Sequence, residues 1–177
     1  ICVAIEENID FKIIQQSLEE FTGAKRRFEC YGDLFGTILV HDYAHHPTEI
    51  KAAIDLAKEV AGGDVFVIFQ PHTYSRTKLL MKDFKTCFHG AKEVLVFKTY
   101  SAREKPEDGA DQNVLANELV KSGENAHAFE SYLEMLKYIF PKLKPNDMLL
   151  VLGAGDIENF LPFVLGKYSR FENVYKK

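Results

Sequence analysis

Residues 65–77 read VFVIFQPHTYSRT and carry the strongest structural signal in the sequence. The first part, from Val65 to Phe69, is entirely apolar and has the length of a strand. An apolar run without polar alternation is expected where helices cover both faces of a parallel sheet. The polar residues from Gln70 to Thr77 are then predicted to form the loop at the carboxyl end of a buried strand.

The alternation of strands and helices continues on both sides of this stretch. Upstream, Pro47 suits the first turn of a helix, whose apolar face carries Ile50, Ala53, Ile54, Ala57 and Val60. Downstream, the periodicity predicts helices over 75–88 and 131–143 and strands over 94–97 and 148–152. Asp111 can cap a helix that bears Leu115 and Leu119, and a further helix follows residue 156. This order predicts the α/β class, with an open, mostly parallel sheet and helices on both faces.

The residues before this alternation are organised differently. Asp10 is the predicted N-cap of a helix that ends at Gly23 and bears on one face Phe11, Ile14, Leu18 and Phe21. Residues 22–26 are the predicted domain boundary. Over 28–40, apolar alternation interrupted by glycines predicts a hairpin that precedes the sheet.

The composition excludes several classes of protein. The 177 residues include 22 basic and 26 acidic side chains, and the net charge of −4 predicts no nucleic-acid partner. No apolar run approaches the ~18 residues that a membrane span needs. The three cysteines lack a CxxC pair, which argues against a disulfide framework and fits a cytoplasmic protein. Because the chain begins at Ile1 inside a helical pattern, we expect it to be part of a longer protein.

Polar loops follow the predicted parallel strands. They cover residues 41–47, 70–77, 99–103 and 153–156, and four of the six histidines lie in the first two loops. In an open α/β sheet, ligands bind outside the carboxyl ends of the strands. We therefore expect these loops to form one polar rim that brings together Asp42, His45, His72 and Arg76.

The histidines of these loops have three interpretations: metal ligands, loop caps, or contacts to a polar substrate. His45 and His46 are adjacent and cannot point the same way, and no second carboxylate lies near them in sequence to complete a metal site. The pattern therefore predicts no metal site and favours substrate recognition, with loop capping left open.

Arg76 falls at the start of a predicted helix, where a cation opposes the positive end of the helix dipole. A bound carboxylate or phosphate would remove this conflict. An ion pair with a nearby Asp or Glu is the alternative.

Two shorter motifs are less specific. Gly153-Ala154-Gly155 is the front of a dinucleotide-binding fingerprint, and a tight turn with Asp156 as the N-cap of the next helix is the simpler explanation. Lys25-Arg26-Arg27 is a basic run at the predicted boundary, either a solvated turn or a phosphate contact beside an interdomain cleft. The sequence contains no GxxxxGK[ST] loop and no nucleophile elbow.

Four motifs together resemble the C-terminal domain of the bacterial Mur ligases, and are most similar to members that join L-alanine to UDP-N-acetylmuramate. They are KRRFE at 25–29, DYAHHPTE at 42–49, FQPHTYSRT at 69–77 and GAGDI at 153–157. The resemblance extends from residue 22 to about residue 167. It implies that residues 1–24 are the end of a central ATPase domain and the hinge, and that residues 25–177 are a Rossmann-like C-terminal domain.

The resemblance also implies an activity. These ligases use ATP and Mg²⁺ to phosphorylate a carboxylate, and the amine of an incoming amino acid attacks the acyl phosphate to form an amide in peptidoglycan-precursor synthesis. The N-terminal and central domains of the same protein would be the partners of this domain. Because the central domain carries the phosphate-binding loop, this chain alone is expected to be inactive.

The family motifs imply roles for particular residues. Arg27 would contact the phosphate region of ATP, and Asp42 the ribose hydroxyls. The residues that would surround L-alanine are Tyr43, His45, His72 and Arg76. Some members have Arg at the position of Thr73, so the alanine carboxylate is expected to rest on Arg76 alone here.

Two alternatives stay open. The first is the C-terminal domain of a murein peptide ligase of cell-wall recycling, a family that shares the loop at 42–47 but not the loop at 70–77. The second is a non-catalytic, flavodoxin-like module that binds a nucleotide or a protein partner.

Overall fold

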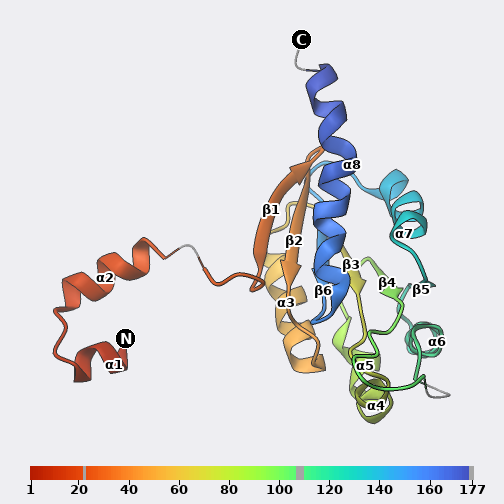
Figure 1. The fold of residues 1–177 in the computed structure, drawn as a ribbon, viewed down its shortest axis with the longest axis horizontal. Helices are drawn as coiled ribbons and strands as arrows, with labels where there is room; N and C mark the ends of the chain where they lie inside the picture. The colour runs from red at the N-terminus through yellow and green to blue at the C-terminus, as the bar shows by residue number, and fades with distance from the viewer. Residues whose placement is uncertain (22, 107–109, 176–177) are drawn as a thin grey trace.

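The computed structural model describes residues 1–21, 23–106 and 110–175 (Figure 1). Thr22, the first residue of the predicted boundary, and residues 176–177 lie outside the described residues. The strands are β1 (Glu29–Leu34), β2 (Thr37–Asp42), β3 (Val65–Phe69), β4 (Glu93–Phe97), β5 (Ala126–Phe129) and β6 (Met148–Leu152). The helices are α1 (Cys2–Glu6), α2 (Phe11–Glu19), α3 (Pro47–Val60), α4 (Tyr74–Leu79), α5 (Met81–Cys87), α6 (Gln112–Lys121), α7 (Tyr132–Ile139) and α8 (Phe160–Tyr175), with 3-10 turns η1 (Phe140–Lys142) and η2 (Asp156–Asn159).

Within the described residues, the strands form one sheet with the order β1-β2-β6-β3-β4-β5. All neighbours are parallel except β1 and β2, which form an antiparallel hairpin at one edge. The last strand, β6, lies between β2 and β3, so that Leu150 is opposite Val40 on one side and Val67 on the other. The predicted mostly parallel α/β sheet is confirmed, and the predicted hairpin is an integral part of it.

Helices cover both faces of the sheet, as predicted. α3, α5 and α6 pack on one face around a core that includes Phe84, and α7 and α8 pack on the other around a core that includes Phe160. β3 is buried along its whole length because its alternate side chains enter the two cores, Val67 one and Ile68 the other. Its sequence therefore lacks the polar alternation of a strand with one wet face.

Three predicted helix starts are confirmed. The carboxylate of Asp10 accepts a hydrogen bond from the N–H of Lys12 at 2.8 Å, and that of Asp111 accepts one from the N–H of Val114 at 2.8 Å. Pro47 is the first residue of α3, where its missing N–H costs no helical hydrogen bond.

Two predicted helices are wrong in extent. The single helix predicted over 75–88 is two helices, α4 and α5, which meet at Leu80. The helix predicted over 131–143 ends at Ile139 and continues as the 3-10 turn η1, since Pro141 cannot donate to an α-helical ladder. Short β5, which carries the partly exposed residues of an edge strand, was not predicted, because its four residues show no clear alternation.

One apolar assignment and one helix cap are also wrong. Val60, predicted to lie on the apolar face of α3, is 52% exposed in the last turn of that helix. α2 ends at Glu19, so Gly23 is not its C-cap. Gly23 has a φ of +91° and lies in the linker, the segment between α2 and β1.

α1 and α2 lie on an arm that stands apart from the sheet (Figure 1). Ile14 is the single buried side chain of these two helices. Phe11, Leu18 and Phe21, predicted to share its face, are each more than half exposed. The arm therefore presents an apolar surface that the rest of the described chain does not cover.

Candidate functional site

The loops that follow the parallel strands meet at one edge of the sheet, as predicted, and Gln70 joins them. This side chain is fully buried directly after β3. Its Nε2 donates to Asp156 Oδ1 at 2.7 Å and to the carbonyl of Lys98 at 3.2 Å, and its Oε1 accepts from the N–H of Ile157 at 3.1 Å. One amide thus fixes the loops after β3, β4 and β6 relative to one another.

The glycines after β6 make room for this packing. A Cβ at Gly155 would lie 2.5 Å from Oε1 of Gln70 and 2.6 Å from the ring of Tyr100. The GAG motif therefore has a packing explanation in this chain, and the prediction of a tight turn stands. The predicted N-cap role of Asp156 is wrong, because no side-chain cap is present and the Asp156 carboxylate accepts from Gln70.

Asp42 ends β2 and organises the loop that follows. Its Oδ1 accepts from the N–H of Ala44 at 2.7 Å, and its Oδ2 accepts from the N–H of Phe28 at 2.8 Å. The residue is 9% exposed. Because each carboxylate oxygen has a second lone pair, Asp42 can accept a further hydrogen bond from a ligand hydroxyl.

A shallow hollow of about 280 Å³ lies beside Asp42. It is lined by Arg27, Phe28, Asp42, Glu49, Ala52, Ala53 and Leu56. Arg27 is exposed and its guanidinium lies 5.8 Å from the centre of the Tyr43 ring. Arg27 and Asp42, predicted to act together, therefore share one concave surface of mixed polarity.

His45 is held by its own loop and by the first turn of α3. The N–H groups of His45 and His46 donate to Oε2 of Glu49 at 3.1 and 3.2 Å, and His46 closes a capping box as the N-cap of α3. Burial of the Glu49 carboxyl opposes ionisation, but the two N–H donors and nearby positive charge, including that of Arg27, outweigh it and lower its pKa. His46 points to the helix start and is exposed, so the two adjacent histidines point in different directions, as their adjacency predicted.

The ring nitrogens of His45 are not equivalent. Nδ1 lies 3.0 Å from the carbonyl oxygen of Tyr43. Because a carbonyl only accepts hydrogen bonds, Nδ1 carries the proton and Nε2 of the neutral ring carries the lone pair. Nε2 makes no hydrogen bond within the described part of the chain.

His72 faces His45 across the rim, with the ring centres 5.8 Å apart. It stacks on Tyr100 at 5.2 Å, and a guanidinium nitrogen of Arg76 lies 3.5 Å from its Nδ1. Burial, followed by the positive charge of Arg76, lowers the pKa of His72. His72 is therefore kept as a neutral ring at neutral pH.

Within the described residues, Arg76 makes no ion pair with a carboxylate, so the predicted ion-pair alternative finds no partner there. Glu104 lies at the start of α4, where it accepts from the N–H of Ser75 at 2.9 Å and from the Ser75 hydroxyl. These hydrogen bonds lower the pKa of Glu104. Glu104 therefore takes the Ser75 N–H at the start of α4, and the Arg76 guanidinium is left available.

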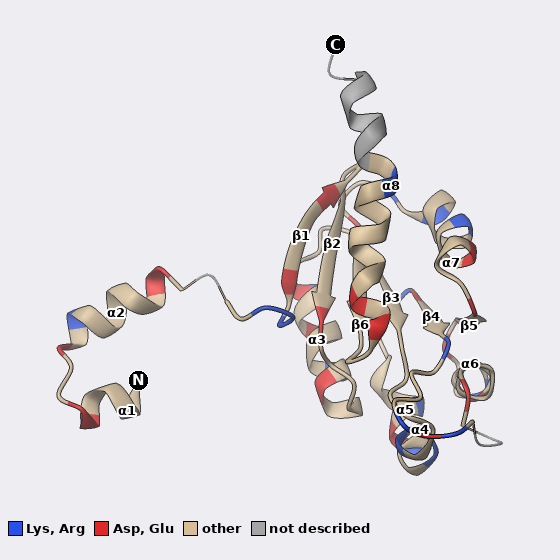
Figure 2. Cartoon of the chain, in the orientation of Figure 1, with Lys and Arg blue, Asp and Glu red and all other residues tan. Residues whose placement is uncertain are grey.

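Arg26 belongs to the basic run at residues 25–27, but its structural role was not predicted. Its guanidinium lies 4.5 Å from the centre of the Tyr43 ring and pairs with Glu158 at 3.0 Å. Its carbonyl accepts from the N–H of Tyr43 at 2.8 Å. Arg26 thus fastens the linker to the rim, where Figure 2 shows the basic segment reaching the sheet.

The structure thus collects the predicted site residues in two adjoining places. Tyr43, His45, His72 and Arg76 form a cluster through successive contacts. Arg27 and Asp42 lie in the hollow beside it. The residues that prediction missed, Gln70 and Arg26, act by holding these groups in place.

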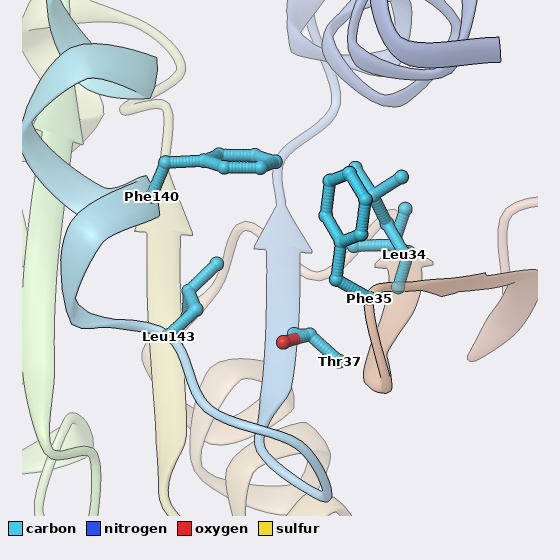
Figure 3. A pocket seen from close by; sticks show the side chains of 6 residues that line it. Leu34, Phe35, Thr37, Phe140 and Leu143 are labelled. Carbon is cyan, nitrogen blue, oxygen red and sulfur yellow. The ribbon is translucent and has the colours of Figure 1, made fainter. Parts of the chain in front are cut away.

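Other features lie away from this edge. A small apolar pocket between the β1–β2 turn and η1, lined by Leu34, Phe35, Thr37, Leu39, Phe140 and Leu143, opens at the amino end of β2 and is therefore remote from the rim (Figure 3). Among the described residues, no group of three or more His, Cys, Asp or Glu side chains has the arrangement of a metal site. None of the described helices is sufficiently long and apolar to cross a membrane.

The sheet order, the two cores and the rim define a domain of the Mur ligases. The chain belongs to this family, because the Mur ligase, glutamate ligase domain matches residues 26–155. Among curated proteins, the chain is 43% identical over 159 residues to the UDP-N-acetylmuramate–L-alanine ligase of Carboxydothermus hydrogenoformans. That alignment covers 90% of this chain and 34% of the relative, so the chain spans about a third of the length of the curated proteins it matches.

Solved structures agree with this assignment. The UDP-N-acetylmuramate–alanine ligase of Thermotoga maritima superposes with a TM-score of 0.77 and 29% identity, covering 96% of this chain and 36% of that one. A murein peptide ligase from Psychrobacter arcticus superposes with a TM-score of 0.65 and 22% identity, covering 93% of this chain and 34% of that one. The second likeness establishes the shared fold alone.

Proposed function

We propose that this chain is the C-terminal domain of an ATP-dependent ligase that joins L-alanine to UDP-N-acetylmuramate in the synthesis of peptidoglycan precursors. The observation that carries the proposal is the cluster of Tyr43, His45, His72 and Arg76 beside the hollow of Arg27 and Asp42. An amino-acid site and a nucleotide site must adjoin in such an enzyme, because the amine attacks a carboxyl group activated by the nucleotide. The similarity to L-alanine ligases supports this choice of substrates.

Arg76 is the proposed anchor for the alanine carboxylate. Its guanidinium has no carboxylate partner in the described chain, and a carboxylate bound there would gain charge-assisted hydrogen bonds. Thr73, which lies three residues earlier, supplies no second cation. We therefore assign the carboxylate contact to Arg76 alone.

Arg27 and Asp42 are the proposed contacts to ATP. The hollow fits a nucleoside because its floor is apolar, its Asp42 edge retains free acceptor positions and its Arg27 edge is cationic. With Mg²⁺, ATP would supply the phosphoryl group that activates the UDP-N-acetylmuramate carboxylate. The residues of this chain would position its ribose and phosphates.

The rest of the ligase is proposed to contact this domain at two places. The apolar arm of α1 and α2 would pack on the central domain, so that residues 1–24 contain its end and the hinge. The polar rim would close against the same domain, which would exclude water from a readily hydrolysed acyl phosphate. The proposal places the enzyme in the cytoplasm, where ATP is available.

The test uses the full-length protein with ATP, Mg²⁺ and UDP-N-acetylmuramate. We expect ADP release to depend on L-alanine, and residues 1–177 alone to release none. ADP release that instead requires a murein tripeptide would indicate a murein peptide ligase. Absence of ADP release with either substrate would reject the ligase proposal and leave a binding module.

A further inference from the structure

We propose that His45 is the general base that removes a proton from the amino group of the incoming amino acid, and that His72 is a neutral hydrogen-bond partner opposite it. This inference rests on the proposed function and extends it by giving the two histidines different chemical roles. An amino acid is an ammonium ion at neutral pH and has no lone pair for attack until one proton leaves. A ligase of this kind therefore needs a proton acceptor beside the nitrogen.

The geometry gives His45 a lone pair on the open side of its ring. Its Nδ1–H donates to the carbonyl of Tyr43 at 3.0 Å, which fixes the tautomer and leaves Nε2 as the basic nitrogen. Oε2 of Glu49 lies 3.6 Å from Nδ1. That carboxylate is held ionised by two backbone N–H groups, so a negative charge lies beside the ring when Nε2 accepts a proton.

The charge beside His72 is positive, whereas the charge beside His45 is negative. Its Nδ1 faces the guanidinium of Arg76 at 3.5 Å, and a guanidinium only donates hydrogen bonds. Nδ1 of His72 is therefore the acceptor, and Nε2–H of the neutral ring is a donor. Burial and the Arg76 charge both oppose protonation of His72, which makes it a poor base beside a cation.

The other groups that face His45 do not reverse this assignment. From its own loop, Tyr43 packs edge-on at 5.3 Å. The guanidinium groups of Arg26 and Arg27 lie on the ring of Tyr43, at 4.5 and 5.8 Å from its centre. From α3, Glu49 contributes the negative charge already described. From the loop after β3, the neutral ring of His72 lies 5.8 Å away, with Arg76 of α4 beyond it. The charge closest to His45 is therefore a carboxylate, whereas the charge closest to His72 is a cation.

In the proposed step, the amide forms after one proton leaves the ammonium group. One N–H proton of the ammonium passes to Nε2 of His45, and the freed lone pair forms a bond to the acyl carbon. The bond from that carbon to the phosphate oxygen breaks. A second N–H proton passes to the departing phosphate, and the third stays on the amide. Imidazolium at His45 then returns its proton to solvent when the domain opens.

The main experiment compares two nucleophiles in the full-length enzyme. His45→Asn keeps an N–H donor for the Tyr43 carbonyl and removes the base; His89→Asn, at a side chain that is 92% exposed, is the matched control. With L-alanine at pH 7, we expect kcat/KM of His45→Asn to fall about 10²–10⁴-fold and to recover as the pH approaches the pKa of the amine. With hydroxylamine, which is already unprotonated at neutral pH, hydroxamate formation should be unchanged.

The outcomes separate this inference from the proposed function. If the wild-type enzyme forms no hydroxamate, it makes no acyl phosphate and the proposed function fails. If hydroxamate forms but His45→Asn loses both nucleophiles equally, or keeps the wild-type pH profile with L-alanine, His45 is not the base. An acid limb that disappears in His72→Asn and persists in His45→Asn would transfer the role to His72 and overturn the proposal.

A second measurement does not depend on catalysis. Ring ¹⁵N resonances of residues 1–177, recorded above the titration range of histidine, report which nitrogen carries the proton. We expect His45 to be protonated at Nδ1 and bare at Nε2. A ring protonated at Nε2 would contradict the proposed lone pair directly.

Discussion

Arg76 shows how a single side chain can be left available by its neighbours. Glu104 satisfies the N–H of Ser75 at the start of α4 and makes no ion pair with Arg76 in the described chain. The guanidinium instead approaches His72 Nδ1 at 3.5 Å, a long contact of modest strength. A ligand carboxylate would be a better partner than the imidazole it now touches.

Replacement of Arg76 by Ala should therefore affect one substrate. In the full-length enzyme, Arg76→Ala should raise the KM for L-alanine about 10- to 100-fold, because a charge-assisted hydrogen bond contributes about 1.5–3 kcal/mol. The KM for ATP should stay within about twofold. Steady-state kinetics with each substrate varied will measure both, and Lys92→Ala at the opposite end of the sheet is the control. An unchanged alanine dependence would remove Arg76 from the site.

Replacement of Asp42 should affect both the KM for ATP and the free energy of unfolding. Asp42→Ala should raise the KM for ATP through the lost ribose contact, and should also lower the free energy of unfolding by about 1–3 kcal/mol, because two N–H groups lose their acceptor. ATP-dependent kinetics and urea unfolding will measure the two effects. A variant with a weakened response to L-alanine only would contradict the ATP assignment.

At the scale of elements, the sequence predicted best what depends on local pattern. The apolar run Val65–Phe69 determined β3 because both of its faces are buried, and the caps Asp10 and Asp111 acted through N–H groups two or three residues away. The loops at 42–49 and 70–77 were also correctly expected to meet, since parallel strands end at one edge.

The structural roles that could not be predicted from the sequence depend on contacts between distant segments. Gln70 binds Asp156 and Lys98, which lie far from it in the chain, so its organising role was invisible although its motif was noted. Arg26 reaches Glu158 across the fold. The break at Leu80 has no proline or glycine to mark it, so the sequence predicted one continuous helix there. The family motifs indicated which residues meet, but their tautomers and charges required the structure.

The linker is the element that joins the arm to the rim. Arg26→Ala should speed amide hydrogen exchange at Phe28 and Tyr43 about tenfold or more, because the guanidinium no longer holds the segment against Tyr43 and Glu158. Lys25→Ala, at the exposed neighbouring position, should leave exchange unchanged. Exchange monitored by NMR on residues 1–177 will compare the two. Equal behaviour of both variants would show that the backbone bonds alone fasten the linker.

An ion pair formed by the carboxylate of Glu118 links α6 to α5. Glu118 on α6 binds Lys85 of α5 and, at 2.7 Å, Lys121. These hydrogen bonds lower the pKa of Glu118 to about 2 in the folded chain. A depressed pKa contributes stability that is present above pH 4.5 and is lost as the pH falls toward 2.

The acid unfolding of a Glu118→Gln variant should therefore be less steep than that of the wild type between pH 4.5 and pH 2. Urea unfolding at a series of pH values will give the free energies. Glu59→Gln, at an exposed position of α3, is the control. Parallel curves for wild type and Glu118→Gln would show that solvent screens these contacts completely.

At the scale of the whole molecule, the arm is predicted to add little to the stability of the sheet domain. Removal of residues 1–24 should change Tm by less than about 2 °C, since a loss of 1 kcal/mol shifts Tm by about 2–4 °C at this size. It should also reduce self-association, because exposed apolar side chains such as Phe11 and Phe21 are removed. Calorimetry and light scattering will test both. A large drop in Tm would mean that the arm is part of the domain core.

The position of β6 in the sheet affects how the chain folds during its synthesis. Until the ribosome has released residues 148–152, the hairpin and the β3-β4-β5 group have no strand to connect them. A nascent chain paused before that point exposes two unpaired, apolar strand borders, and such borders are templates for misassembly. The strand that joins the two parts of the sheet is thus the last of its strands to be made, so stalling or truncation near residue 147 should be far more harmful to solubility than a cut near residue 168.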